Sequence, residues 1–382
     1  FGNDNAVCTA QQAALTPFLP TLGATAAGLI GLACQGNSTA ELNGVSINDS
    51  RSEDEWTGTA ILSYKPVDDL LLYASFARGY KAGGFNLDRS ALKSPILPFG
   101  GQAGAQALVG NLQFDPELVD SYEVGAKYST GPFSLSVSAF RSDFSNFQLN
   151  TFNGTVFLVA TVNGCDSLIG GPDADTDFGA TANATGACAP DDVTYGVRTQ
   201  GFELEAQLVP ARNFRMAAGL TYARTKYRDD LVGNKNGTPL DQALRKLPGD
   251  NLSNAPELVA TGSVTWTPDI GSSGLTGLVY IDGRMTSDYN TGSDLFPQKE
   301  QDGYALFNAR IGVRGPDEKW GVELWAQNIF NKNYSQVAFN SPFQAGTTSA
   351  PFTDPQYPGG RQIFSQFLAE PRTYGVTLRG KF

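Results

Sequence analysis

The chain has 382 residues, and single cores usually stop growing near about 250–300 residues, so its length suggests several domains, one large barrel or a repeat. Its 43 glycines, 11% aromatic residues and 17% charged residues suit many strands and turns better than helices rich in Ala, Glu and Lys. A formal net charge of −11 argues against nucleic-acid binding, and the absence of histidine removes the usual general base of an enzyme.

The first 55 residues precede the first predicted strand and contain Cys8 and Cys34, and a second pair, Cys165 and Cys188, follows later. Each pair closes a stretch rich in Gly, Asn and Asp, which predicts two disulfides of the kind that persist outside the cytoplasm. Zinc binding and free thiols are the alternatives, and zinc is disfavoured because the chain has no histidine and no Cys-x-x-Cys spacing. The apolar stretch 15–34 contains proline and glycine, so we expect a short helix or coil there, not a transmembrane helix.

From residue 56 onward the sequence repeats an alternating segment of about ten to fifteen residues. In segment 133–141, Phe133, Leu135 and Val137 share one face while serines occupy the other. In segment 201–208 the apolar residues oppose Glu203 and Glu205, which suits a water-filled lumen better than a soluble core. About eleven strands are predicted, over 56–64, 70–80, 118–128, 133–141, 201–208, 214–222, 258–266, 275–285, 305–313, 320–330 and 374–382.

The connections between these segments alternate between short and long. Short turns are expected near 66–69, 130–132, 210–213, 268–274 and 315–318, and long connections near 81–116, 150–193, 229–256, 289–302 and 331–371. Outer-membrane barrels combine short periplasmic turns with long extracellular loops. A soluble β-propeller or β-helix is the alternative, but its repeats should show a fixed period, and here the unit length varies widely.

The predicted fold class is therefore all-β, an antiparallel transmembrane β-barrel portion of about eleven strands. If the last strand ends in the periplasm, counting back through the strands places residues 1–55 in an extracellular loop. Both cysteine pairs then lie outside the cell. The expected organisation is an extracellular loop over 1–55 with the Cys8–Cys34 pair, followed by the barrel over 56–382.

Four motifs make the barrel expectation more specific. LLYASFARGYKAGGFN (71–86), DPELVDSYEVGAKYS (115–129) and KWGVELWAQNIFNKNY (319–334) resemble stretches of the TonB-dependent receptor family. The C-terminal sequence PRTYGVTLRGKF resembles an outer-membrane assembly signal, with Tyr374, Val376, Leu378 and Phe382 as its alternating apolar residues. The resemblance covers essentially residues 56–382.

The resemblance implies a fold and partners. Family members have a barrel of about twenty-two strands around an N-terminal plug, so this chain would supply roughly the second half of the barrel. No signal peptide, plug or TonB box is found in the sequence, which we therefore expect to be a fragment. Eleven strands leave two open edges. The implied partners are outer-membrane lipid, the missing plug and barrel half, the TonB complex acting through the missing TonB box, the barrel-assembly machinery and a small nutrient ligand.

Candidate site residues follow from position along the strands. Cations and rings near the outer strand ends are candidates for binding an anionic ferric chelate: Lys81, Phe85, Arg141, Phe147, Arg224, Arg284, Tyr289 and Tyr334. Charged residues with the polar parity are expected to face the lumen and plug: Glu123, Lys127, Glu203, Glu205, Asp282 and Glu323. Trp56, Trp266, Trp320 and Tyr374 have the opposite parity and are expected to face lipid. An interfacial girdle or a solvated loop is the alternative for each ligand candidate.

The expected function is energy-coupled import of a scarce nutrient such as a ferric siderophore across the bacterial outer membrane. A passive porin-like channel and an adhesin-type structural barrel are the alternatives. No catalytic constellation or cofactor site is found, so we expect neither an enzyme nor a bound cofactor.

Overall fold

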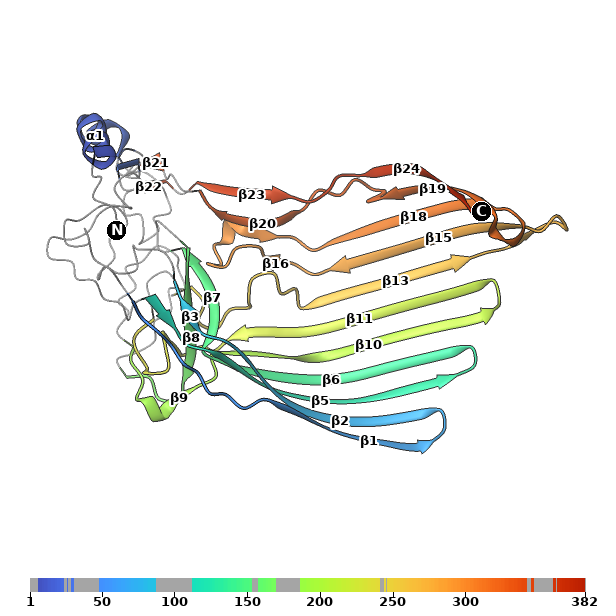
Figure 1. Ribbon diagram of the computed structural model, residues 1–382, viewed down its shortest axis with the longest axis horizontal. Helices are drawn as coiled ribbons and strands as arrows, with labels where there is room; N and C mark the ends of the chain where they lie inside the picture. Colours follow the sequence, from blue (N-terminus) through green and yellow to red (C-terminus); the bar gives the residue numbers. More distant parts are fainter. Residues whose placement is uncertain are drawn as a thin grey trace.

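The computed structural model describes residues 6–23, 26, 29–30, 48–86, 112–152, 157–169, 186–240, 244, 246–341, 345–346, 360–361 and 363–381. Its dominant element is one antiparallel sheet in which each long strand pairs with the next one along the chain (Figure 1). Within the described residues this sheet has twelve strands, the short strand β14 (Asp269–Ile270) pairing only with β15. The other eleven are β1 (Gly58–Val67), β2 (Leu70–Lys81), β5 (Glu117–Thr130), β6 (Phe133–Ser145), β10 (Val197–Ala211), β11 (Phe214–Tyr227), β13 (Leu258–Trp266), β15 (Leu275–Thr286), β18 (Tyr304–Arg314), β19 (Trp320–Gln327) and β24 (Thr373–Gly380).

These eleven strands confirm the predicted number and order, but several run further than predicted toward the long connections. Strand β6 continues to Ser145 where the alternation stops at residue 141, and β11 continues to Tyr227 where it stops at 222. The added residues place Asp143 and Lys226 on the face that is apolar nearer the turns. The alternation of apolar and polar residues therefore stops there, although the strands stay hydrogen-bonded to their neighbours. In the other direction, β19 ends at Gln327, since Asn328 takes a left-handed conformation with φ 48°.

The sheet has one apolar face and one polar face because the register keeps like residues opposite one another. Phe202 lies opposite Tyr222 and Leu204 opposite Leu220, whereas Glu203 lies opposite Ser138. The apolar face is uncovered: Leu62 is 75% exposed and Leu378 is 75% exposed. Burial of apolar side chains against another protein layer therefore does not explain this face. The predicted lipid-facing residues of the described strands, Trp266, Trp320 and Tyr374, all have the parity of this face.

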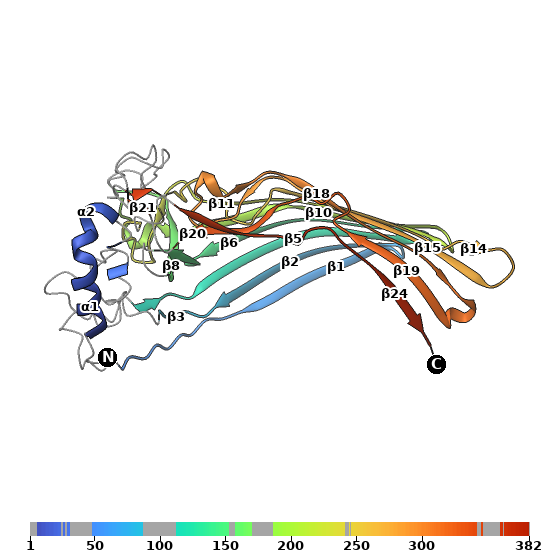
Figure 2. The ribbon, with the colours of Figure 1, turned by 90° about the horizontal axis from the view of Figure 1, so that it is seen from above.

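The sheet curves without closing, as Figure 2 shows from a second direction, with β1 and β24 bending toward the same side. In the described residues β1 pairs only with β2, and β24 pairs only with β19. Short turns gather at one end and long connections at the other, as predicted (Figure 1). No helix among the described residues is long and apolar enough to cross a membrane. The first helices, α1 (Ala6–Leu15) and α2 (Leu19–Leu22), flank a 3-10 turn with Pro17 in its first positions.

The long connections contain ordered structure that the sequence analysis missed. A small sheet is formed by β7 (Phe147–Phe152), β8 (Phe157–Cys165), β9 (Val193–Thr194) and β12 (Leu231–Val232), which come from two different connections. Cys165 and Cys188 form a disulfide, with a Cα–Cα distance of 5.9 Å, so this predicted pair is confirmed. Cys34 lies outside the described residues, and the Cys8–Cys34 pair stays a prediction.

An apolar cluster packs against this small sheet at the loop end of the barrel strands. Its buried members are Leu149, Val162, Val197, Tyr227, Leu231, Leu240, Leu244, Leu247 and Leu295. Val197 and Tyr227 are opposite residues at the ends of β10 and β11, on the polar-face side of the sheet. The loops are thus packed onto the inner side of the strand ends.

Candidate functional site

The polar face of the sheet carries the charged residues that the sequence analysis expected there. Register pairs place Glu205 opposite Ser136, Asp282 opposite Ser263 and Glu323 opposite Thr377. Glu123, Lys127 and Glu203 share the same parity on their strands. The Tyr73 hydroxyl donates a short hydrogen bond to Glu123, and the Lys127 ammonium lies over the Tyr73 ring. Charged and polar side chains on this face therefore extend across neighbouring strands.

A hollow of about 440 Å³ lies on this face where β10, β11, β13 and β15 meet. Glu205, Thr261, Asp282 and Arg284 contribute polar side chains to it. Small residues line the strands between them, so the backbone itself forms part of the floor. Asn308 donates a hydrogen bond to Asp282 at 2.8 Å, which fixes that carboxylate. The Arg284 side chain is exposed and available to a ligand in the hollow.

Three tyrosines gather beside Arg284 at the loop end. Tyr304 and Tyr334 are stacked with ring centroids 4.3 Å apart, and the hydroxyl groups of Tyr289 and Tyr304 are 3.4 Å apart. Thr286 is opposite Tyr304 on the neighbouring strand, so Arg284 lies one polar-face position away. The structure thus brings together Arg284, Tyr289 and Tyr334 and adds Tyr304. Tyr304 has the parity of Asn308 and Arg310 and lies one residue before the predicted strand 305–313, so its parity is the sequence signal for it.

Glu323 is the most deeply buried charge on the polar face, with 0% of its side chain exposed. Arg310 and Arg314 of β18 lie 3.1 and 3.3 Å from its carboxylate, and Arg379 of β24 lies 3.6 Å away. A buried carboxylate is costly unless it is paired and hydrogen-bonded. The three guanidinium groups satisfy this one carboxylate and join the last three strands.

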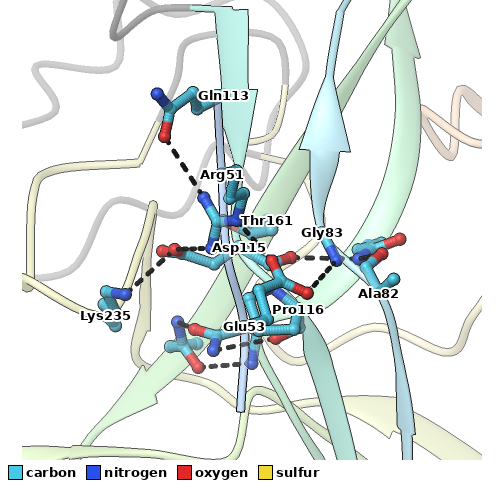
Figure 3. Close-up of polar contacts among 12 residues, drawn as sticks. Arg51, Glu53, Ala82, Gly83, Gln113, Asp115, Pro116, Thr161 and Lys235 are labelled. Atoms are coloured by element: carbon cyan, nitrogen blue, oxygen red, sulfur yellow. Dashed lines mark hydrogen bonds and ion pairs between the residues drawn. The ribbon is translucent and has the colours of Figure 1, made fainter. Parts of the chain in front are cut away.

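A polar network at the loop end holds the segment before β1 against two long connections (Figure 3). The Asp115 carboxylate lies 2.9 Å from the Arg51 guanidinium and 3.0 Å from the Lys235 ammonium. Glu53 pairs with Arg51 and accepts a hydrogen bond from the backbone N–H of Gly83 at 3.1 Å. The hydrogen bond to Asp115 raises the pKa of Arg51 above its usual value. This arrangement is structural, since its charges are neutralised within the protein.

The family described as "TonB dependent receptor-like, beta-barrel" matches residues 35–329, which is more than half of the chain. The chain belongs to this family. TonB-dependent receptors are outer-membrane β-barrels, so the protein is located in the outer membrane.

Two known receptors are similar to parts of the chain. The ferric-pyoverdine M114 receptor PbuA of Pseudomonas sp. (strain M114) is 26% identical over 191 residues, which are 49% of this chain and 18% of PbuA. The ferric yersiniabactin uptake receptor FyuA of Yersinia pestis is 17% identical and has a TM-score of 0.54, covering 85% of this chain and 37% of FyuA. The second likeness concerns the fold alone. The chain spans less than two fifths of FyuA.

The remaining ligand candidates lie in different places on this TonB-dependent receptor barrel. Lys81 ends β2 opposite Glu117 on the polar face, and Phe85 lies in β3 (Gly84–Phe85), which pairs with β4 (Gln113–Phe114). Phe147 packs against the apolar loop cluster and meets the Tyr227 ring edge-on at 6.1 Å. The register places Arg141 and Arg224 opposite Gln200, on the outer face of the sheet, which is the face that carries the apolar side chains. The candidates therefore do not form one site.

Proposed function

We propose that this chain forms part of the barrel wall of a TonB-dependent importer that carries a scarce nutrient, such as a ferric siderophore, across the outer membrane. The observation that carries the proposal is the polar lumen face with its hollow beside Arg284 and the three tyrosines. A guanidinium group binds anionic oxygen ligands, and tyrosine rings supply flat apolar surface for a chelate. The name of PbuA, a ferric-pyoverdine receptor, supports a ferric chelate as the ligand.

The ligand site in this proposal consists of Arg284, Tyr289, Tyr304 and Tyr334, with Lys81 and Phe85 near the mouth. Glu123, Lys127, Glu203, Glu205 and Asp282 are proposed to line the path and contact a plug. Arg141 and Arg224 are left out because their face is turned to lipid. TonB and a plug domain are the partners that energy-coupled import requires, and both are part of the proposal.

The test uses the full-length gene that contains this chain, expressed in a host without its own siderophore receptors. Iron-limited growth is measured with a panel of ferric siderophores, with and without TonB. We expect growth on at least one siderophore only when TonB is present. Growth that is independent of TonB would indicate a passive channel, and no uptake of any panel member together with host-cell binding would indicate an adhesin; either result contradicts the proposal.

The site is tested separately with Arg284→Gln. Loss of one charge-assisted contact should weaken ligand binding by about tenfold. Arg215→Gln on β11 is the matched control, because Arg215 has lumen parity but lies opposite Thr265, at the turn end. Equal uptake kinetics for Arg284→Gln and the wild type would remove Arg284 from the site without affecting the importer assignment.

A further inference from the structure

The outer face of the sheet carries a lateral band of charged side chains at its loop end. The band contains the cations Arg78, Arg141, Arg198, Arg224 and Lys226 and the carboxylates Asp120 and Asp143. Register pairs join them across neighbouring strands: Arg78 is opposite Asp120, and Arg198 is opposite both Asp143 and Lys226. All share the parity of the lipid-facing side chains. The cations outnumber the carboxylates on this part of the outer face.

The band lies directly next to a row of outward-facing aromatic rings. Phe76 and Tyr122 are 5.2 Å apart on β2 and β5, and Phe202 and Tyr222 are 5.7 Å apart on β10 and β11. Arg78 and Arg224 each lie two residues beyond one of these rings toward the loops, a distance of about 7 Å along a strand. Aromatic rows of this kind mark the boundary between hydrocarbon and head groups. The cations are therefore at the level of the head groups of the outer leaflet.

A pocket of about 430 Å³ opens within this band at the ends of β10 and β11. Its four cations are Arg198, Arg224, Lys226 and Arg228, and its two carboxylates are Asp229 and Asp230. The guanidinium groups of Arg198 and Arg228 lie over the Tyr195 ring, 4.2 and 5.0 Å from its centroid. Tyr195 thus holds two cations in place before any ligand arrives.

The cations of the pocket differ in how fully they are neutralised. Arg198 makes two contacts with Asp143, the shorter at 2.6 Å, and Arg228 lies 2.9 Å from Asp166. Arg224 approaches Glu257 only to 3.9 Å, and Lys226 interacts electrostatically with Asp250 without forming an ion pair with any residue that the structure describes. Two cations on β11 therefore retain capacity for an external anion.

We propose that this pocket binds the phosphate groups of the phosphorylated glycolipid of the outer leaflet, the lipid A part of lipopolysaccharide. Arg and Lys bind phosphate through charge-assisted hydrogen bonds, and clusters of them at a membrane surface recognise anionic head groups. The acyl chains lie along the apolar face below, against Phe202 and Tyr222. The pocket is on the lipid side of the sheet, opposite to the lumen hollow, so this inference rests on the outer-membrane location and not on the imported ligand.

The test uses the full-length receptor, purified in detergent and freed of lipid, with diphosphoryl lipid A as the probe. The double variant Arg224→Gln/Lys226→Gln should bind this probe about tenfold more weakly than the wild type. The control pair Arg212→Gln/Arg215→Gln changes one cation in the turn after β10 and one at the turn end of β11, and it should bind as the wild type does. Equal affinity for the double variant and the wild type, or an equal loss in both pairs, would overturn the proposal.

The wild-type receptor gives a second test that does not depend on folding of a variant. Lipid A without phosphates should bind about tenfold more weakly than the diphosphoryl form, and inorganic phosphate at equal concentration should not displace the bound lipid. If dephosphorylated lipid A binds equally well, or if inorganic phosphate alone competes equally, the pocket is not a lipid head-group site.

Discussion

Arg310 of β18 donates a hydrogen bond to Glu323 of β19 at 3.1 Å, across a register in which Gly312 lies directly opposite Glu323. The missing side chain of Gly312 leaves room there, since a Cβ at that position would come within 2.9 Å of Glu323 Cγ. Glu323 is thereby buried against the sheet and reached by guanidinium groups from β18 and β24. This arrangement holds β24, an edge strand within the described residues, to the rest of the sheet.

Glu323→Gln should destabilise the folded barrel by about 2 kcal/mol, because it leaves three arginines without their shared carboxylate while those arginines keep some access to water. The measurement is urea unfolding of the full-length protein in lipid vesicles, followed by the shift in gel mobility of unheated samples. Glu318→Gln is the control, since Glu318 is largely exposed and pairs with Arg314 alone among the described residues. Equal midpoints for both variants would show that Glu323 does not join the strands.

Ile281→Arg should impair membrane insertion, because Ile281 is exposed on the lipid face and a charge there costs about 2–4 kcal/mol near the bilayer midplane. Ser263→Arg is the matched change on the neighbouring strand, where the new cation faces the lumen beside Asp282. The folded fraction in vesicles is measured for both. Equal folding of the two variants would contradict the assigned faces.

Replacing Cys165 and Cys188 by serine should lower the stability of the loop sheet by about 3 kcal/mol while the barrel strands still assemble. Hydrogen exchange in β8 and β12 should accelerate, whereas exchange in β13 and β15 should not change. Unaltered protection in β8 would mean that the apolar cluster alone holds the loops.

Phe147→Ala should lower the stability of the loop sheet and its apolar cluster by about 3 kcal/mol, because Phe147 packs against the apolar cluster and the Tyr227 ring. Phe147→Leu should restore most of the hydrogen-exchange protection and also the uptake. If Phe147→Leu restores protection but not uptake, the ring itself contacts the ligand, as position along the chain had suggested.

The barrel strands were predictable from sequence because each has one apolar and one polar face, and the register in the structure preserves this alternation. Their loop ends were not, since Asp143, Arg198 and Lys226 put charges on the outer face while the ladder continues. The loop sheet and its apolar cluster could not be predicted from the sequence for a different reason. Its buried leucines, such as Leu149, Leu231 and Leu247, come from separate connections and show no period.

The candidate site was likewise predictable from the sequence only in part. Parity alone placed Glu205, Asp282 and Glu323 on the polar face, because parity depends only on counting along a strand. Proximity across strands depends on register, which the sequence does not show. The Tyr304–Tyr334 stack therefore emerged only from the structure. Arg224 has the parity of Tyr222, so its face follows from counting once β11 is known to continue past residue 222.

The most direct test of the central claim, that this sheet is a barrel wall between lipid and lumen, is a nitroxide scan along β18 in the full-length protein in vesicles. Labels at Phe307, Ala309 and Ile311 should be accessible to oxygen dissolved in lipid, and labels at Asn308 and Arg310 to a water-soluble nickel chelate. The account predicts accessibility that alternates with a period of two along the strand. Accessibility to the water-soluble reagent at every position, or no alternation, would contradict it.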